Sequence, residues 1–412
     1  MRSLRTLVGQ VQGDFRRVLL ATLFVGAVSG IFQSTFNNYL SDVHGLDASA
    51  RGWLELPREL PGFVIFAVVG LLLIRLRESR IAALAMIATA LGSLGLGLLA
   101  PGPALLVVWT IVWSLGDHII FAVEGPLGLK LARDGAEGRR LGQLGGARNL
   151  GVILGVSGVW LTAKLIGDRY DIFFLAGTAC AAVAGLFYLR LQLGREDPPS
   201  RRLVWRREYR IFYAISALFG IRKQIFLVFG TWVLVSLHQV PVSTIALLYF
   251  IGAALGVLLR PLLGDVIDWL GERTVLAVDE LLLLLVCLVY AFASDLLAAP
   301  WDLRLLYGAY VADNVLFALR VARTTYLKKI ALDPADITPT ISLGVTIDHA
   351  VAMTLPILSG WLWERYGHQW VFLLAGALAL AGFFICLRIR VPAPGSRGPL
   401  TGPAGAPGTG GA

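Results

Sequence analysis

The sequence is poor in charge and in cysteine, and each shortage excludes a class of protein. Only 15% of its 412 residues are Asp, Glu, Lys or Arg, whereas 57% are hydrophobic and the mean hydropathy is +0.73. Soluble domains carry about 25% charged residues, so this composition indicates an integral membrane protein. The three cysteines, Cys180, Cys287 and Cys386, all lie in apolar runs without metal-type spacing, which argues against a disulfide framework or a zinc site.

The sequence also lacks the common catalytic motifs. It contains no phosphate loop of the type G-x-x-x-x-G-K-[ST], no H-E-x-x-H and no nucleophile elbow. We therefore expect no enzyme, no cofactor, no bound metal and no ATP-driven pump. The formal charge of +9 does not indicate a nucleic-acid partner, because Lys and Arg flank the apolar runs instead of forming one patch.

What the sequence does have is a series of apolar runs of about 20 residues, each long enough to cross a bilayer as a helix. They lack the alternation of barrel strands, so the predicted class is an all-α membrane protein. Six runs precede a basic stretch with two prolines and six follow it, at 18–40, 61–75, 81–100, 104–128, 142–163, 172–191, 211–236, 243–262, 274–293, 303–325, 338–362 and 370–388.

The runs predict two six-helix bundles, at 1–193 and 211–390, joined by a linker at 194–210 and followed by a disordered tail at 391–412. Assigning alternate loops to opposite sides places most of the 36 Lys and Arg residues on the side of both termini and the linker. By the positive-inside rule that side is cytoplasmic, and we expect the protein in the cell membrane. The first run is interpreted as a retained span, not a cleaved signal peptide.

The two halves resemble each other, which is typical of transporters built from repeats. RRVLLATLFVGAVSGIF (16–32) aligns with RIFYAISALFGIRKQIF (210–226), so that Gly26 meets Gly220. Asp117 in SLGDHIIF likewise pairs with Asp313 in VADNVLF. These matches predict two pseudo-symmetric bundles in the same orientation.

The chain resembles the major facilitator superfamily over about residues 10 to 390, because it has two six-span halves, a basic linker between them and motifs matched between the halves. The most specific match is GDVIDWLGER, which resembles the superfamily's loop signature G-x-x-x-D-x-x-G-x-R and implies a latch formed by Gly264, Asp268, Gly271 and Arg273. The first-half copy, GLLLIRLRESR from Gly70, has Ile74 in place of the acid and Arg77 in place of the second glycine. The run 342–367 is similar to a stretch in uncharacterised bacterial members.

The resemblance implies that spans 1, 4, 7 and 10 line a central cavity. Charged residues in hydrocarbon cost about 2.5 to 3.5 kcal/mol each and normally face a bundle interior. Polar residues on those spans are therefore candidates for solute and ion binding or for a gate: Gln33, Asn37, Asn38, Asp117, His118, Glu124, Arg222, Lys223, Gln224, Asp313, Asn314 and Arg320. We expect Arg222 to pair with Asp117 or Asp313 near mid-depth; a static pair that fixes helix packing is the alternative.

Several further polar residues have a predicted role. Asp348 on span 11 is a candidate for proton binding with Asp117 and Asp313, since burial raises the pKa of a carboxyl group. His118 and His349 each follow an aspartate, which suits either proton handling or helix packing. Residues near the cytoplasmic mouths are predicted to form gates or latches: Glu124, Arg320, Asp279 and Glu280.

These patterns predict a monomeric secondary active transporter that works by alternating access. Its partners are a small-molecule solute, coupling protons and the lipid bilayer. The resemblance favours export, and Arg222 with Lys223 suggest a site for an anionic group. The alternative is a non-transporting membrane receptor or assembly partner of the same fold.

Overall fold

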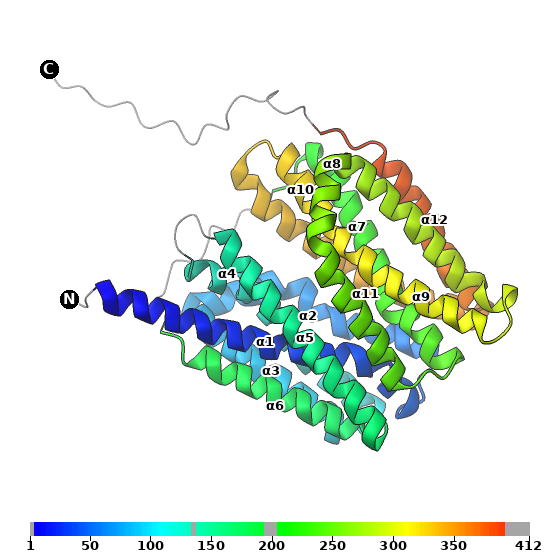
Figure 1. The fold of residues 1–412 in the computed structure, drawn as a ribbon, viewed down its shortest axis with the longest axis horizontal. Helices are drawn as coiled ribbons and strands as arrows, with labels where there is room; N and C mark the ends of the chain where they lie inside the picture. The colour runs from blue at the N-terminus through cyan, green and yellow to red at the C-terminus, as the bar shows by residue number, and fades with distance from the viewer. Residues whose placement is uncertain (1–3, 133–136, 193–203, 392–412) are drawn as a thin grey trace.

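The computed structural model describes residues 4–132, 137–192 and 204–391, most of them in helices (Figure 1). In these ranges 11 helices are long and apolar enough to cross a membrane, or 12 if the bent pair Ala48–Ile65 and Ala67–Arg75 is one span. The predicted all-α membrane class is confirmed. Most of the predicted linker, and the predicted tail from 392 onward, lie outside the described residues.

The first half forms a bundle in which α1 packs against α5 and α6, and α3 packs against α4 and α6. One apolar cluster in this bundle includes Ile81, Met86 and Ile120, which are at most 1% exposed. The helices are α1 (Leu4–Asp42), α2 (Ala48–Arg75), α3 (Glu78–Leu98), α4 (Pro103–Lys130), α5 (Glu137–Ile166) and α6 (Tyr170–Leu189).

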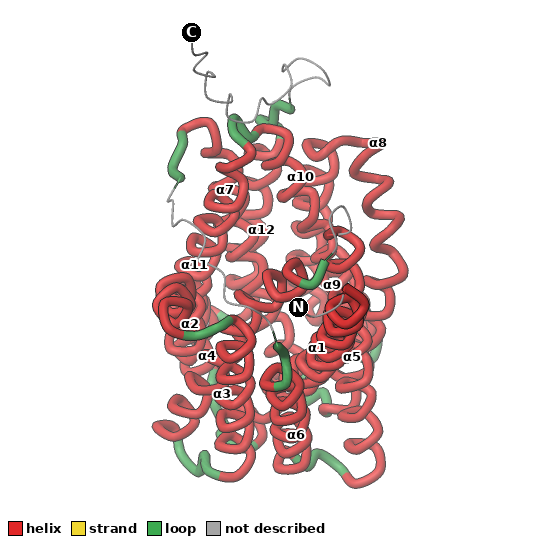
Figure 2. The backbone as a smooth tube through the Cα atoms, turned by 90° about the vertical axis from the view of Figure 1, so that its left-hand side faces the viewer, coloured by secondary structure: helices red, strands yellow, loops and turns green. Residues whose placement is uncertain are grey.

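The second half forms the other bundle, and Figure 2 shows the two groups of helices one above the other. Its helices are α7 (Arg210–Gln224), α8 (Val242–Leu296), α9 (Trp301–Leu316), α10 (Val321–Ile330), α11 (Ile337–Tyr366) and α12 (His368–Cys386). α8 covers the predicted spans 8 and 9, and its one non-helical residue is Gly271, with φ of 78°. Glycine adopts that left-handed backbone without a Cβ penalty, so it breaks the helix there.

The seventh span runs from Arg207 to Leu237, so Arg222 and Lys223 lie inside it as predicted. Beyond Gln224 the helix continues as two π-helical segments, Ile225–Gly230 and Val233–Leu237. Such wide turns are rare and are frequently found at functional sites.

The start of α2 corrects a prediction. We expected this span to begin near residue 61, but the helix begins at Ala48, where the Asp47 side chain accepts a hydrogen bond from the Ala50 amide. Pro57 and Pro61 are both inside the helix. Four charged residues lower the hydropathy of this segment, but all are buried and compensate one another: Arg51, Glu55, Arg58 and Glu59.

The predicted repeat has a structural counterpart. A Cβ at Gly26 on α1 would lie 2.1 Å from the carbonyl oxygen of Arg148 on α5, and one at Gly220 on α7 would lie 2.8 Å from that of Asp348 on α11. Helices 1 and 5 of the first bundle therefore approach each other at the same aligned position as helices 7 and 11 of the second.

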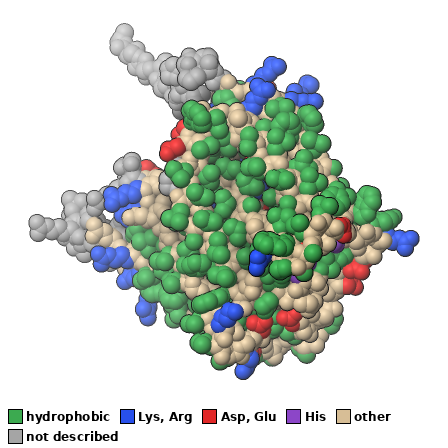
Figure 3. Space-filling view, turned by 45° about the vertical axis from the view of Figure 1, so that its right-hand side comes forward, with side chains coloured by type: hydrophobic (Ala, Val, Ile, Leu, Met, Phe, Trp, Pro, Cys, Tyr) green, Lys and Arg blue, Asp and Glu red, His purple; other side chains and the backbone are tan. Residues whose placement is uncertain are grey.

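The bundles contact each other through α2 with α11 and through α5 with α8. Near the end of α1, Asn38 donates to the Val240 carbonyl at 2.8 Å. The face seen in Figure 3 is largely covered by hydrophobic side chains, with most Lys and Arg near its edges. This is the surface that a span in lipid requires.

Candidate functional site

A cavity of about 210 Å³ lies between α1 and the helices of the second bundle. Its walls include five of the predicted polar residues, Gln33 from α1 and Arg222, Lys223, Asp313 and Asn314 from the second bundle. Three tyrosines that we did not predict also line it: Tyr249, Tyr290 and Tyr310. The structure thus brings together residues from five of the spans and gives them a partly aromatic wall.

Arg222 is held by two carboxylates. Its Nη1 donates to both oxygens of Asp279 at 2.9 and 2.8 Å, and its Nη2 donates to Oδ1 of Asp313 at 3.2 Å. The expected contact with Asp313 is therefore present, whereas Asp117 is not a partner. Asp279 lies at this central site, not beside Arg273 in a terminal latch as we expected. Two carboxylates on one guanidinium leave one negative charge in excess.

Lys223 also has carboxylate partners. Its Nζ lies 3.0 Å from Oδ1 of Asp348 and 3.9 Å from Oε2 of Glu59, so it links α7 to both α11 and α2. The predicted anion site needs cations that no carboxylate of the protein already compensates. In this conformation both Arg222 and Lys223 have carboxylate partners.

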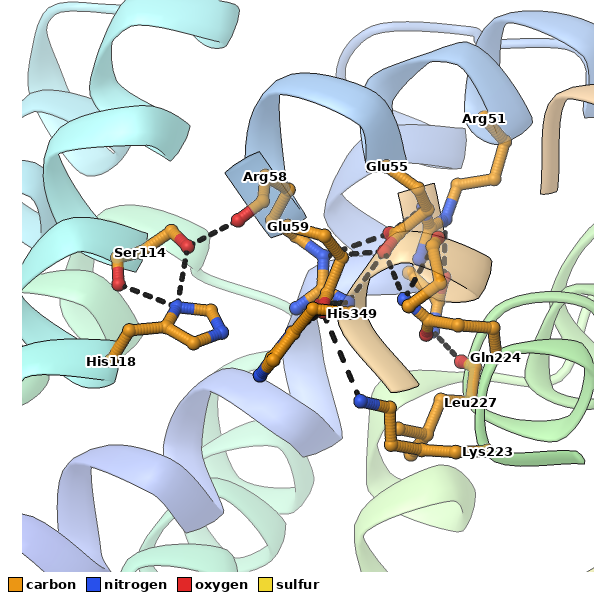
Figure 4. Close-up of polar contacts among 12 residues, drawn as sticks. Arg51, Glu55, Arg58, Glu59, Ser114, His118, Lys223, Gln224, Leu227 and His349 are labelled. Atoms are coloured by element: carbon orange, nitrogen blue, oxygen red, sulfur yellow. Dashed lines mark hydrogen bonds and ion pairs between the residues drawn. The ribbon is translucent and has the colours of Figure 1, made fainter. Parts of the chain in front are cut away.

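The charged residues of α2 form a buried group that we call the α2 cluster: Arg51, Glu55, Arg58 and Glu59 (Figure 4). Glu55 accepts hydrogen bonds from Arg51 and Arg58 and is completely buried. Arg51 also donates from Nε to Oδ1 of Asn37 at 2.8 Å. Gln224 of α7 donates to Oε2 of Glu55 at 3.2 Å, so the cluster reaches the second bundle.

Glu59 extends this contact to α11. One of its oxygens pairs with Arg58 at 2.7 Å, and the other lies 2.8 Å from Nδ1 of His349. His118 of α4 lies beside His349, with ring centroids 5.0 Å apart. The two histidines therefore meet each other and not the aspartates that precede them. Asp117 forms no ion pair with any residue that the structure describes.

Two other predicted binding residues, Asn37 and Asn314, donate hydrogen bonds to backbone carbonyls of helices. Asn37 donates to the Leu227 carbonyl at 3.3 Å, which ties α1 to the π-helical part of span 7. Asn314 donates to the carbonyl of Tyr310, one turn earlier in α9.

The predicted gate residues are dispersed. Glu124 pairs with Arg148 at 3.3 Å within the first bundle, and Arg320 is exposed with its guanidinium over the Phe317 ring. Glu280 points toward α12, where a Cβ at Gly382 would lie 2.7 Å from its carboxyl carbon.

The latch residues expected from the resemblance do not pair in this conformation. Gly264 and Asp268 lie within α8, and Asp268 is exposed. Within the described ranges Asp268 and Arg273 form no ion pair; the neighbouring Glu272 is buried and pairs with Lys329 at 2.6 Å instead. Arg273 lines a wide depression beside the end of α12.

Sequence reasoning missed the α2 cluster altogether. The signal was present, because Arg51 with Glu55 and Glu55 with Arg58 have the i,i+4 and i,i+3 spacings at which opposite charges meet on a helix. The hydropathy of the segment is too low for a predicted span, because a hydropathy scale scores each residue alone and ignores pairing between opposite charges.

Comparison with known proteins supports the same architecture. The model of the Major Facilitator Superfamily matches residues 18–322. Among solved structures, the nucleoside transporter NupG superposes with a TM-score of 0.74 at 15% identity, covering 91% of this chain and 98% of that one. A D-xylose–proton symporter gives 0.70 at 15% identity, covering 93% and 98%.

A bacterial homolog of the human lysosomal transporter Spinster, in an inward-facing and unoccupied conformation, gives a TM-score of 0.69 at 14% identity, covering 92% of this chain and 97% of that one. No curated protein matches the chain in sequence. At such identities the solved structures establish the fold alone, whereas the family model covers most of the chain. The chain belongs to the Major Facilitator Superfamily.

Proposed function

We propose that this protein is a secondary active transporter that exchanges protons for a small cationic solute by alternating access. The observation that carries the proposal is the excess carboxylate at the cavity: Arg222 faces both Asp279 and Asp313. A buried uncompensated charge is costly. A proton or a cationic group at Asp313 removes that cost equally well.

Asp313 is the carboxylate that a solute can reach. It lines the cavity together with Tyr249, Tyr290 and Tyr310, whereas Asp279 is not among the lining residues. Aromatic faces attract cations by about 0.5 to 2 kcal/mol, most strongly where water is excluded. The hydroxyl of Tyr290 is buried without a hydrogen-bond partner among the described residues, so a solute donor or acceptor has a group to bind.

Competition for one carboxylate couples the two fluxes. When Asp313 binds a proton it no longer attracts the solute, and when it binds the solute it no longer needs the proton. Exchange of this kind, driven by an inward proton gradient, exports the solute, which agrees with the direction expected from the resemblance. An anionic solute is not part of the proposal, because both cations at the cavity have carboxylate partners.

The first experiment identifies a solute. Small primary and quaternary ammonium compounds, with size-matched carboxylates as controls, are tested for a shift in the thermal unfolding midpoint, since a bound ligand stabilises the native state. The proposal predicts hits among the ammonium compounds. If only the carboxylates shift the midpoint, the solute is anionic and the proposed cationic solute is wrong.

The second experiment tests coupling with the identified ammonium compound in proteoliposomes. Uptake driven by a pH gradient should be lost in Asp313→Asn and kept in Asp295→Asn, an exposed carboxylate at a helix end. Wild-type transport that persists after the gradient is collapsed would contradict proton coupling.

The alternative from another class is a receptor of the same fold that binds but does not transport. A compound that raises the unfolding midpoint yet never crosses the bilayer in wild-type proteoliposomes, with or without a gradient, would favour that receptor.

A further inference from the structure

Two histidines from opposite bundles face each other near the midpoints of their helices. His118 comes from α4 and His349 from α11, and their rings are tilted by 68° with centroids 5.0 Å apart. One ligand atom from each of Glu59, His118 and His349 lies within 4.8 Å of the other two. Figure 4 shows His118 next to Ser114 and His349 next to Glu59.

The backbone leaves space for this contact at Gly62 on α2. A Cβ there would lie 2.6 Å from Nε2 of His118 and 2.5 Å from Cε1 of His349, which are contacts that real Cβ atoms do not make. Any side chain at this position would require the imidazoles to shift.

Hydrogen bonds fix the tautomer of both histidines. The His118 Nδ1 lies 2.8 Å from the Ser114 carbonyl oxygen, which can only accept, and the Ser114 hydroxyl already donates to the Arg58 carbonyl. The His349 Nδ1 lies 2.8 Å from a carboxylate oxygen of Glu59, which also accepts. Each Nδ1 therefore carries the proton, and each neutral ring presents a lone pair on Nε2.

This is the arrangement that orients metal-binding histidines. A ligating His commonly donates its second N–H to a backbone carbonyl or a carboxylate, which sets the ring and raises the basicity of the other nitrogen. Here one histidine has the carbonyl and the other the carboxylate. Within the described part of the chain, neither Nε2 has a hydrogen-bond partner.

Carboxylates lie near both histidines. Glu59 contacts His349, and it also pairs with Arg58 and Lys223. Asp117 acts electrostatically on both His118 and Arg58.

We propose that His118 and His349 bind a divalent transition-metal ion through their Nε2 atoms, with Glu59 positioning His349. Imidazole nitrogen suits Zn²⁺, Ni²⁺, Cu²⁺ and Co²⁺. Because the ligands belong to different bundles, the ion joins α4 to α11 and holds the bundles in this conformation. The site is separate from the cavity at Asp313, so it is testable without a solute.

The test uses the full chain, purified without a polyhistidine tag and titrated with CoCl₂ by visible absorbance and with NiCl₂ by calorimetry. We expect saturable 1:1 binding. His118→Gln and His349→Gln should each weaken it by about 100-fold, since even the loss of a group that only orients a ligand costs about 10- to 100-fold. Glu59→Gln should weaken it about 10-fold. His44→Gln, in the loop after α1 where the ring packs against Tyr39, is the matched control and should bind like wild type.

Gly62→Ala keeps every ligand and displaces only the rings, so it should also weaken binding. The unfolding midpoint of Gly62→Ala without metal shows whether weaker binding comes from a folding defect. The Gly62→Ala variant also keeps the test decisive if a histidine variant fails to fold. Absence of saturable binding in wild type, or binding of unchanged affinity in both histidine variants, would overturn the proposal.

Discussion

The two buried charge groups of this protein differ in what they join. The α2 cluster reaches across the bundle interface, through Glu55 to Gln224 and through Glu59 to His349. Arg222, by contrast, finds both of its carboxylates inside the second bundle, on α8 and α9. Bundles that rock against each other must break the first set of contacts and can keep the second. We infer that the α2 cluster sets the conformational equilibrium, whereas the Arg222 group sets the charge of the cavity.

The largest effect is expected for Glu55→Ala. Glu55 is completely buried and compensates Arg51 and Arg58, so its removal leaves two buried cations short of a partner. Breaking a buried ion pair from one side costs about 3 to 5 kcal/mol. The thermal unfolding midpoint in detergent should fall accordingly. An unchanged midpoint would mean that water solvates the α2 cluster. The α2 cluster would then not differ from the Arg222 group in how strongly its charges depend on one another.

A somewhat smaller loss is expected for Arg222→Gln, about 3 kcal/mol from the lower end of the same range. It leaves Asp279 and Asp313 without a cation, but Asp313 lines the cavity, where water can solvate it. Adding Asp279→Asn and Asp313→Asn to this variant should restore most of the loss, because both carboxylates that Arg222 compensated are then removed. A triple variant that is no more stable than Arg222→Gln would show that packing and not charge explains the loss.

The sequence was sufficient for the parts of this fold that depend on long apolar runs and on single deep charges. Arg222 and Lys223 were placed inside their span because the run before them is itself apolar, and the structure agrees. Partners were harder to predict. His118 and His349 are far apart in the chain, and only the packing of α4, α2 and α11 brings them together.

The beginning of α2 shows the physical reason for the largest error. Arg51 and Glu59 are costly in lipid one at a time, so a residue-by-residue scale moves the segment into water. Paired and buried against α7 and α11, the same residues stay within the protein. Asp279 was misplaced for a related reason: its distance along the chain from Arg273 is short, but its partner is on another helix.

A moderate effect is expected for Gln224→Leu, which removes the hydrogen bonds to Glu55 and to the Ala352 carbonyl. Leaving a buried acceptor without a partner costs about 1 to 3 kcal/mol. Ser236→Ala, which loses only a bond to the carbonyl one turn earlier in the same span, is the matched control. Equal losses in the two variants would remove the distinction between contacts across the bundle interface and contacts within one helix.

The smallest effect is expected at the surface. Arg169 and Asp171 form an exposed pair at the start of α6, with both side chains more than a third exposed. Exposed pairs contribute little, because water already solvates both partners. Arg169→Gln should therefore leave the unfolding midpoint unresolved from wild type in parallel melts, and a clear decrease would show that pair burial is not what separates the strong sites from the weak ones.

The most direct test of the difference between the two groups is a distance between the bundles. Two spin labels report this distance in nanodiscs, one at Leu129 on α4 and one at Val321 on α10, once the three native cysteines are replaced. These two side chains are 43% and 52% exposed. We predict that Glu59→Gln shifts the distance distribution by pulse dipolar spectroscopy, whereas Asp279→Asn leaves it as in the otherwise native chain. A shift in Asp279→Asn with none in Glu59→Gln would contradict the assignment of the conformational equilibrium to the α2 cluster.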